Sequence, residues 1–401
     1  MEKNSNLPFW QTLPAVLFLV VLPLNHTMAL RLIFLFLTAA VALRCYFKTG
    51  APPLPLKLPL ALWAGIALLS LTWSFDPLFS LTEIKAEIGY GMLAFFSFFV
   101  LTRDPDAWKI YLRALLAGLA GTFVFVAIRV IQLGHAPSYD DWDWQHGYVS
   151  YSTYLAMALP FLFLPLLGTM DKRLRSAAWI LLPIYLWVAY LNANRMFWVS
   201  FGLVLMIFLV GAWNKMTDVN ARRKLLLAGL LGIVLTGAAF LSVVQMKVSA
   251  TASAGTAIAT TFGKSERYII WHYWLERIAE RPLTGVGFAR DLPHFVYAKP
   301  AEWPPFWFAH AHNLFLDYVL QLGIPGLMVF LFLLGAMARE FWRLYRGADK
   351  EAWMVGLAGL GLLAALISKN MTDDLFWRTD ALFFWASAGI LLGYGKRRGM
   401  K

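Results

Sequence analysis

Two histidines stand two residues apart in the stretch WFAHAHNLFLDY, residues 307 to 318. An imidazole with an unperturbed pKa of about 6.5 is mostly neutral near pH 7, so it can accept a proton from a reacting hydroxyl. His312 directly precedes an apolar run, which predicts a position at the start of a helix at the membrane edge. We therefore expect His312 to be a catalytic base, with an interfacial anchor as the alternative. His310 is more ordinarily a supporting residue.

Four arginines are candidates for binding a phosphate group. Arg195 follows the short turn NAN, and Arg267 stands in the stretch GKSERYIIW. A guanidinium stays charged and offers forked donors that match phosphate oxygens. A long side chain at the end of a span can instead snorkel to the interface, which is the alternative for Arg195 and the favoured interpretation of Arg31. Arg267 could also be a surface residue of a first helical turn, and for Arg129 both roles stay open.

Two acidic residues, Asp317 and Asp380, lie within or beside apolar stretches. A lone carboxylate is costly there and often marks a functional position. Each could orient a base or an arginine, or it could pair two helices, and the sequence leaves both interpretations open.

The stretch YDDWDWQH offers a different chemistry. Its ligand types could hold Mg²⁺ or Mn²⁺, and they are Asp140, Asp141, Asp143 and His146. A solvated acidic loop is the simpler explanation, because arginines can supply the positive charge that a metal would bring. We therefore expect neither a metal nor a cofactor.

Membrane helices must position these residues. The chain of 401 residues is 60% apolar and 14% charged, with a mean hydropathy of +0.61, far from the composition of a soluble domain. Its apolar stretches approach the ~20 residues that cross a ~30 Å hydrocarbon core, and they are too long and unalternating for barrel strands. We predict an all-α integral membrane protein with about twelve transmembrane helices. The expected ranges are 10–24, 28–47, 56–74, 86–102, 108–133, 149–168, 176–192, 196–213, 224–244, 323–341, 353–369 and 378–395.

The basic residues orient the chain. With the N- and C-termini in the cytoplasm, every inner connection is rich in lysine or arginine, as short cytoplasmic loops are. The outer connections are short or acidic, among them FDPLFSLTE at 75 to 83 and NMTDDLF at 370 to 376. The net charge of +12 is then mainly a signal of topology, and no nucleic-acid partner is expected. The single cysteine, Cys45, excludes an internal disulfide.

Three parts of the chain follow from this topology. Residues 1–244 hold nine helices, residues 245–322 form one large outer loop, and residues 323–401 hold the last three helices and a basic tail. Within the loop, GKSERYIIWHYWLERIAERP has the spacing of an amphipathic helix that lies on the membrane surface. The apolar face is expected to comprise Tyr268, Trp271, Leu275 and Ile278. The stretch GIPG should break the helix that follows His312.

These motifs together resemble a known family. An arginine after a short outer turn (NANR), SERYIIW with PLTGVGF in one large outer loop, and HAHNLFLDYVLQLGIPG before the closing spans are similar to the O-antigen ligases of bacterial lipopolysaccharide assembly. Related O-antigen polymerases and protein O-oligosaccharyltransferases are slightly less similar. The likeness extends over the whole topology, and its specific part is the region from 190 to 330.

The resemblance implies a GT-C-like membrane glycosyltransferase that acts without a metal and inverts the anomeric centre. Such an enzyme transfers O-antigen polysaccharide from undecaprenyl diphosphate to a sugar hydroxyl of lipid A core, on the periplasmic face of the bacterial inner membrane. Carried onto this chain, the family histidine falls on His312 and the family arginines on Arg195 and Arg267. His310, Asp317, Asp380 and Arg129 are possible supporting residues.

Other functions stay open at this stage. A polymerase or a protein glycosyltransferase would differ only in its acceptor, which the sequence reveals least. A transporter of lipid-linked glycans would need charged residues deep within several helices, along a path open to both sides. The few charges in the middle of the spans favour an enzyme.

Overall fold

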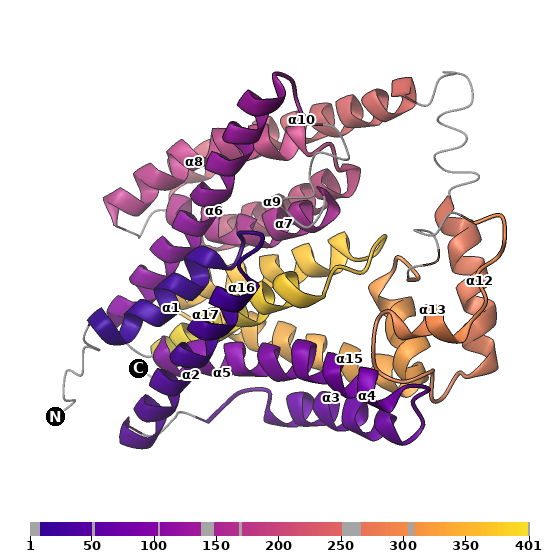
Figure 1. The fold of residues 1–401 in the computed structure, drawn as a ribbon. Coiled ribbons are helices and arrows are strands. Elements are labelled where there is room, and N and C mark those ends of the chain that lie inside the picture. Colours follow the sequence, from indigo (N-terminus) through magenta and orange to yellow (C-terminus); the bar gives the residue numbers. More distant parts are fainter. Residues whose placement is uncertain are drawn as a thin grey trace.

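The computed structural model describes residues 9–49, 53–102, 105–137, 148–167, 171–250, 266–303, 308 and 310–399. Helices and their connections make up these residues, and Figure 1 shows how the helices are arranged. The candidate metal ligands between residues 140 and 146 lie outside the described residues. The helices are α1 Phe9–Val21, α2 Met28–Thr49, α3 Lys57–Leu69, η1 Ser70–Thr72, α4 Pro77–Glu83, η2 Ile84–Gly89, α5 Tyr90–Leu101, α6 Pro105–Leu133, α7 Tyr148–Phe163, η4 Leu164–Leu167, α8 Lys172–Leu191, α9 Arg195–Lys215, α10 Val219–Ala250, α12 Glu266–Glu280, α13 Leu292–Val296, α15 Leu314–Arg346, α16 Lys350–Lys369 and α17 Arg378–Gly399.

Nine of the expected spans are long and apolar enough to cross a membrane, counted over the described residues. The spans expected at 10–24, 56–74 and 378–395 correspond to α1, α3 with η1, and α17. Helices α1 and α3 have 13 residues each, about 20 Å of helix against a ~30 Å hydrocarbon core. Helix α17 is long enough, but polar residues at both of its ends lower its mean hydropathy. The structure therefore confirms a multi-pass α-helical protein, although not the full count of about twelve.

One expected outer connection is helical. The segment FDPLFSLTE contains α4, which begins after Asp76 because the Asp76 side chain accepts a hydrogen bond from the Phe79 backbone N–H at 2.9 Å. Helix α4 then continues through the π-helical turn η2 into α5. The span in this region is consequently Pro77–Leu101 and is longer than the expected 86–102.

Small residues allow the central helices to approach closely. Helix α17 packs against α5, and the stretch GILLG of α17 places Gly389 and Gly393 against that helix. A Cβ atom at either glycine would lie 2.5 Å from a backbone carbonyl oxygen, of Phe95 or of Phe99. Helix–helix association in membranes relies on such contacts, because lipid gives no hydrophobic drive for helices to associate.

Helix α15 breaks where GIPG predicts. Gly323 has φ 68° and ψ −176°, a conformation that residues with a side chain rarely adopt. The break frees backbone carbonyls, and the glycine turn PLTGVGF supplies donors for them: Val286 N–H donates to Leu320 O and Gly287 N–H donates to Gln321 O, both at 2.9 Å. These two backbone hydrogen bonds therefore fix the PLTGVGF turn against the break in α15 at GIPG.

The described part of the segment predicted to form the large outer loop has its own small core. Ile270 and Trp274 of α12 pack with Trp303, Phe308 and Leu320. Of the expected apolar face of α12, Trp271 and Ile278 pack against this core, whereas Tyr268 is 69% exposed and Leu275 is 51% exposed. Helix α12 thus uses one face for the protein and leaves part of the expected face outward, where it is available to the membrane surface. Figure 1 shows α12 and α13 at the opposite end of the molecule from α1 and the C-terminal end of α17.

Candidate active site

The segment 310–313, the histidine loop, is fixed by hydrogen bonds of Asn313 and Asp317. Helix α15 begins at Leu314 because the Asn313 side chain accepts the backbone N–H groups of the first turn, from Phe315 at 3.0 Å and Leu316 at 3.2 Å. His312 precedes this cap with φ 50°, a left-handed conformation that costs energy for a residue with a side chain. Asp317 is fully buried and accepts the Ala311 backbone N–H at 2.8 Å. Asp317 therefore fixes the loop and not the imidazoles themselves.

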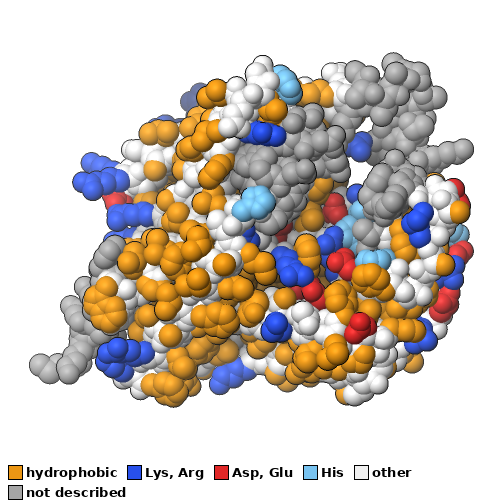
Figure 2. Space-filling view, in the orientation of Figure 1, with side chains coloured by type: hydrophobic (Ala, Val, Ile, Leu, Met, Phe, Trp, Pro, Cys, Tyr) orange, Lys and Arg blue, Asp and Glu red, His pale blue; other side chains and the backbone are white. Residues whose placement is uncertain are grey.

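The segment between α16 and α17 meets this loop. Leu314 N–H donates to Asn370 O and Asp373 O, and the Asn313 side chain donates to Met371 O at 2.9 Å. These bonds place Asp373 against the histidines. Figure 2 shows basic, acidic and histidine side chains gathered in one part of the molecular face.

Asp373 is the centre of the site. Its Oδ1 lies 3.5 Å from His310 Nε2 and 3.5 Å from His312 Nδ1, and its Oδ2 lies 3.9 Å from the Arg267 guanidinium. Arg267 is the second residue of α12, so α12 and the connection between α16 and α17 each contribute to the cluster. The structure thus brings together three of the residues that the sequence indicated, His310, His312 and Arg267, around an acid that it did not.

At this centre Asp373 is held in its charged form, whereas His310 is held in its neutral form. Burial works to raise the pKa of Asp373, but the adjacent His312 ring, His310 and Arg267 hold it well below its usual range. Burial, with Arg290 nearby, lowers the pKa of His310 well below its usual value. His310 is therefore neutral near pH 7, and its Nδ1 accepts the His312 backbone N–H at 3.3 Å. A neutral ring that accepts at Nδ1 carries its proton on Nε2, which faces Asp373. His310 thus supports the site.

A second acid–arginine pair lies beside the first. Arg290 is 3.9 Å from Asp374, which is itself 3% exposed. Burial raises the pKa of Asp374, Arg290 lowers it, and Asp373 raises it again; the net shift is upward. Neighbouring carboxylates with opposite shifts are common where a protein tunes ionisation for function.

The cluster also has the donors of a metal site. His310, His312 and Asp373 each offer one ligand atom, and these atoms lie within 4.8 Å of one another. Two histidines and a carboxylate suit zinc or another transition metal. Arg267 and Arg290 oppose this use, because fixed positive charges beside the ligands repel a dication. The expectation of a metal-free site therefore stays a prediction.

Arg195 lies at the same end of the helix bundle as the cluster. Asn194 caps α9 by accepting the Phe197 backbone N–H at 3.2 Å, so Arg195 begins that helix. Ser200 of α9 accepts a hydrogen bond from Ser368 of α16 at 2.9 Å. Arg195 is five residues from Ser200 towards the start of α9, about 7.5 Å along the axis. It has no ion-pair partner among the described residues, so its charge is available to an anion.

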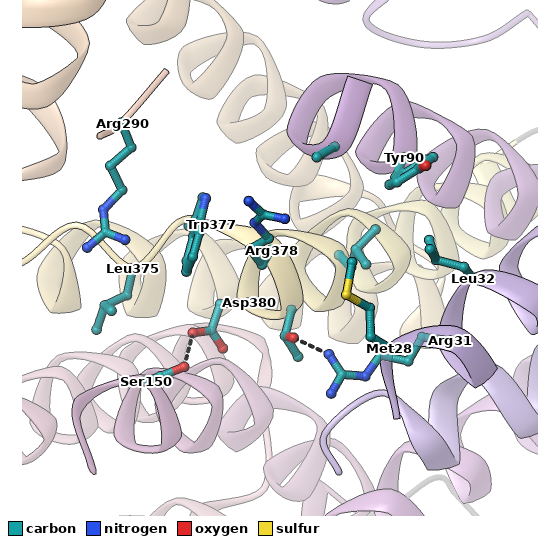
Figure 3. Close-up of a pocket in the computed structure, with 13 residues that line it drawn as sticks. Met28, Arg31, Leu32, Tyr90, Ser150, Arg290, Leu375, Trp377, Arg378 and Asp380 are labelled. Carbon is teal, nitrogen blue, oxygen red and sulfur yellow. Dashed lines mark hydrogen bonds between the residues drawn. The ribbon is translucent and has the colours of Figure 1, made fainter. Parts of the chain in front are cut away.

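The remaining candidates lie elsewhere. Asp380 accepts a hydrogen bond from Ser150 at 2.8 Å, which joins α17 to α7 in a separate cavity (Figure 3). Arg31 lines that cavity and donates to Thr379. Arg129 stands on α6, two helical turns from Thr122, and α6 packs against α1 and α8. For Asp380 the structure shows the pairing of helices that the sequence left open.

Sequence reasoning missed Asp373, Asp374 and Arg290. Both acids belong to NMTDDLF, which was interpreted only as an acidic outer connection, and Arg290 of the large loop was not singled out. The available signal was the closeness of two acids to the ends of two apolar spans, where a buried carboxylate needs a partner.

The fold and the site define an integral membrane protein with a buried histidine–aspartate–arginine centre at one end of its helices. Residues 177–331 match the family described as O-antigen ligase. Provisionally named polysaccharide ligases are similar over shorter stretches: one of Rickettsia conorii is 29% identical over 24% of this chain and 25% of its own length, and one of Rickettsia bellii is 26% identical over 40% of this chain and 38% of its own. Residues 177–331 are therefore similar to the O-antigen ligases, the family that the motifs between residues 190 and 330 indicated.

Proposed function

We propose that this protein transfers O-antigen polysaccharide from undecaprenyl diphosphate to a sugar hydroxyl of lipid A core. The observation that carries the proposal is the contact of Asp373 with both His312 and Arg267, which joins a base and a phosphate ligand in one cluster. The family match and the names of the relatives support the class of reaction.

His312 is the base in this proposal. A proton on its Nδ1 directed at Asp373 leaves the lone pair on Nε2, which can take the proton of the acceptor hydroxyl. Asp373 then stabilises the imidazolium that forms, as an orienting carboxylate does in other histidine-based catalysts. The left-handed conformation of His312 helps to fix the direction of the ring.

Arg267 and Arg195 bind the diphosphate. A diphosphate on an anomeric carbon is already a good leaving group, so the enzyme must mainly neutralise the charge that develops on it. The Arg267–Asp373 distance of 3.9 Å is long for an ion pair and leaves the guanidinium able to engage phosphate oxygens. Attack from the face opposite the diphosphate inverts the anomeric centre. The two arginines supply the charge of a metal, and the reaction is metal-independent.

The protein would act at the outer face of the bacterial inner membrane, with both termini in the cytoplasm. The basic connections support this orientation. The partners are the lipid-linked polysaccharide, lipid A core and the surrounding membrane lipids, and the architecture is GT-C-like.

Purified components test the proposal. Wild type with carrier-linked polysaccharide and lipid A core should give modified lipopolysaccharide, in chelator as without it. His312→Ala should abolish transfer, whereas His272→Ala should not, because His272 is exposed on α12, where it pairs with Glu276. Elongation of the carrier-linked chain in place of transfer to lipid A core would identify a polymerase. Loss of transfer in chelator would overturn the metal-free mechanism.

A further inference from the structure

A cavity of about 410 Å³ is lined by Arg290, the partner of Asp374, and by the first residues of α17 (Figure 3). It lies between α2, the turn from η2 to α5, α7 and the start of α17, and Arg290 of the outer loop completes its wall. Much of the wall is apolar, with Met28, Leu32, Tyr90 and Leu382. Met28 is 59% exposed on the outer end of α2, so this side of the cavity reaches the surface of the bundle.

Three arginines and one acid, Asp380, line the cavity. Figure 3 shows Trp377 between Arg290 and Arg378, and the two guanidinium carbons lie 5.1 Å and 4.6 Å from its ring centroids. Glu83 orients this stack, since its two oxygens accept the Trp377 indole N–H at 3.4 Å and the Arg378 guanidinium at 2.8 Å. Arg31 adds a third positive charge that is held by Thr27, Thr379 and the Leu24 carbonyl.

Two buried donors point to a ligand. Neither the Nε of Arg290 nor the Nε of Arg378 has a hydrogen-bond acceptor among the described residues, although both atoms are buried. Buried N–H groups of folded proteins almost always have a partner, because leaving one unmade is costly. Arg290 is only 13% exposed and its Asp374 partner is 3.9 Å away. Both arginines therefore retain the capacity to bind an anion.

We propose that this cavity binds the phosphorylated head group of a membrane lipid, with Arg290 and Arg378 as phosphate ligands. The apolar wall contacts the first part of the hydrocarbon chain. Such a wall would contribute nothing to the binding of a soluble anion, and it therefore favours a lipid as the ligand. The inference rests on the proposed function for its substrate class: both lipid substrates carry phosphate, the donor as a prenyl diphosphate and lipid A as phosphorylated glucosamine.

The arginines of the cavity are separate from Arg195 and Arg267, so the cavity is a further binding site. It shares one wall with the histidine cluster, because Arg290 pairs with Asp374 and Asp374 follows Asp373. A lipid substrate bound here has its head group beside the histidine cluster. The cavity would therefore position that substrate for reaction with the other one.

Equilibrium binding to the full-length protein in lipid nanodiscs tests the proposal, with farnesyl diphosphate and a short-chain lipid A as probes. Loss of a charge-assisted hydrogen bond should raise the Kd of the bound lipid by about tenfold to hundredfold in Arg378→Gln and in Arg290→Gln. Arg113→Gln is the matched control, because it removes a comparable 2.7 Å ion pair with Asp171 at the other end of the bundle. The probe whose Kd changes identifies the source of the phosphate.

Two further results decide the case. Unchanged Kd values for both probes in both folded cavity variants would overturn the proposal, and so would inorganic pyrophosphate that competes as tightly as farnesyl diphosphate. Arg378→Lys, which keeps the charge and loses the fork, should recover part of the affinity, and thermal unfolding shows whether each variant is folded. Binding requires no transfer. A protein that binds lipid phosphate through these arginines but transfers no glycan would refute the proposed function alone.

Discussion

Asp373→Asn is the sharpest test of the active-site geometry. The substitution keeps the size of the side chain and removes the charge that faces His312. A full charge at 3.5 Å from a newly formed imidazolium is worth about 5 kcal/mol at an effective dielectric constant of ~20. Asp373 and His312 are 11% and 12% exposed, so water screens this interaction little. Arg267 at 3.9 Å offsets part of it, and we expect kcat to fall by roughly 10² to 10³, about 3 to 4 kcal/mol.

The assay is single-turnover transfer of carrier-linked polysaccharide to lipid A core at saturating donor. Asp373→Glu should recover part of the lost rate, because it restores the charge at a different distance. Asp291→Asn is the control: Asp291 lies in the same outer loop, and its side chain does not cap α13. A rate for Asp373→Asn within about threefold of wild type would refute the role of Asp373 in stabilising the imidazolium.

Three further outcomes follow from the structure. Replacing Arg267 or Arg195 by Gln should lower kcat/KM for the donor by about tenfold to hundredfold, measured from initial rates against donor concentration; no change in either variant would exclude a phosphate contact. A Cβ at Gly323 would lie 2.4 Å from the Leu283 carbonyl carbon at φ 68°, so Gly323→Ala should destabilise the protein by about 2 kcal/mol or more, whereas Gly335→Ala, in open space, should not lower the melting temperature. Burial raises the pKa of Asp374 in the folded state to about 6, so the wild type loses stability as the pH rises from about 4 to about 6; the melting temperature of Asp374→Asn minus that of wild type should increase over this range and level off above it, and a flat difference would contradict the shift.

The fold was largely predictable because membranes leave few choices. A backbone in lipid must satisfy its own hydrogen bonds, so apolar stretches of sufficient length become helices. The same reasoning explains where prediction stopped. Helix α4 depends on a cap by Asp76, a local contact that the composition of FDPLFSLTE conceals behind its polar residues. The short helices α1 and α3 were counted as full spans because hydropathy reveals where a segment is apolar more clearly than where its helix ends.

The site was predictable only in part, because its residues converge from distant segments. His312 could be recognised from the sequence because it directly precedes an apolar helix. Arg267 could be recognised because it lies at the start of the amphipathic helix α12. Asp373 follows them by more than fifty residues, and nothing local distinguishes it from Asp374. Only the packing of the α16–α17 connection against Asn313 makes one acid the partner of the histidines and the other the partner of Arg290.

The positions of the buried charged side chains help to distinguish an enzyme from a transporter. Among the described residues the buried charged side chains converge on one end of the bundle, on or beside the segment from Lys369 to Asp380, and they are Arg31, Glu83, Asp317, Lys369, Asp373, Asp374 and Asp380. Arg31 and Glu83 reach this segment by hydrogen bonds to Thr379 and Arg378. A transporter that moved a diphosphate across the membrane would need compensating charges along the whole path, since a phosphate in hydrocarbon without a partner is very costly. Charges confined to one end instead favour chemistry on a substrate whose lipid chain stays in the membrane while its head group reacts at the surface.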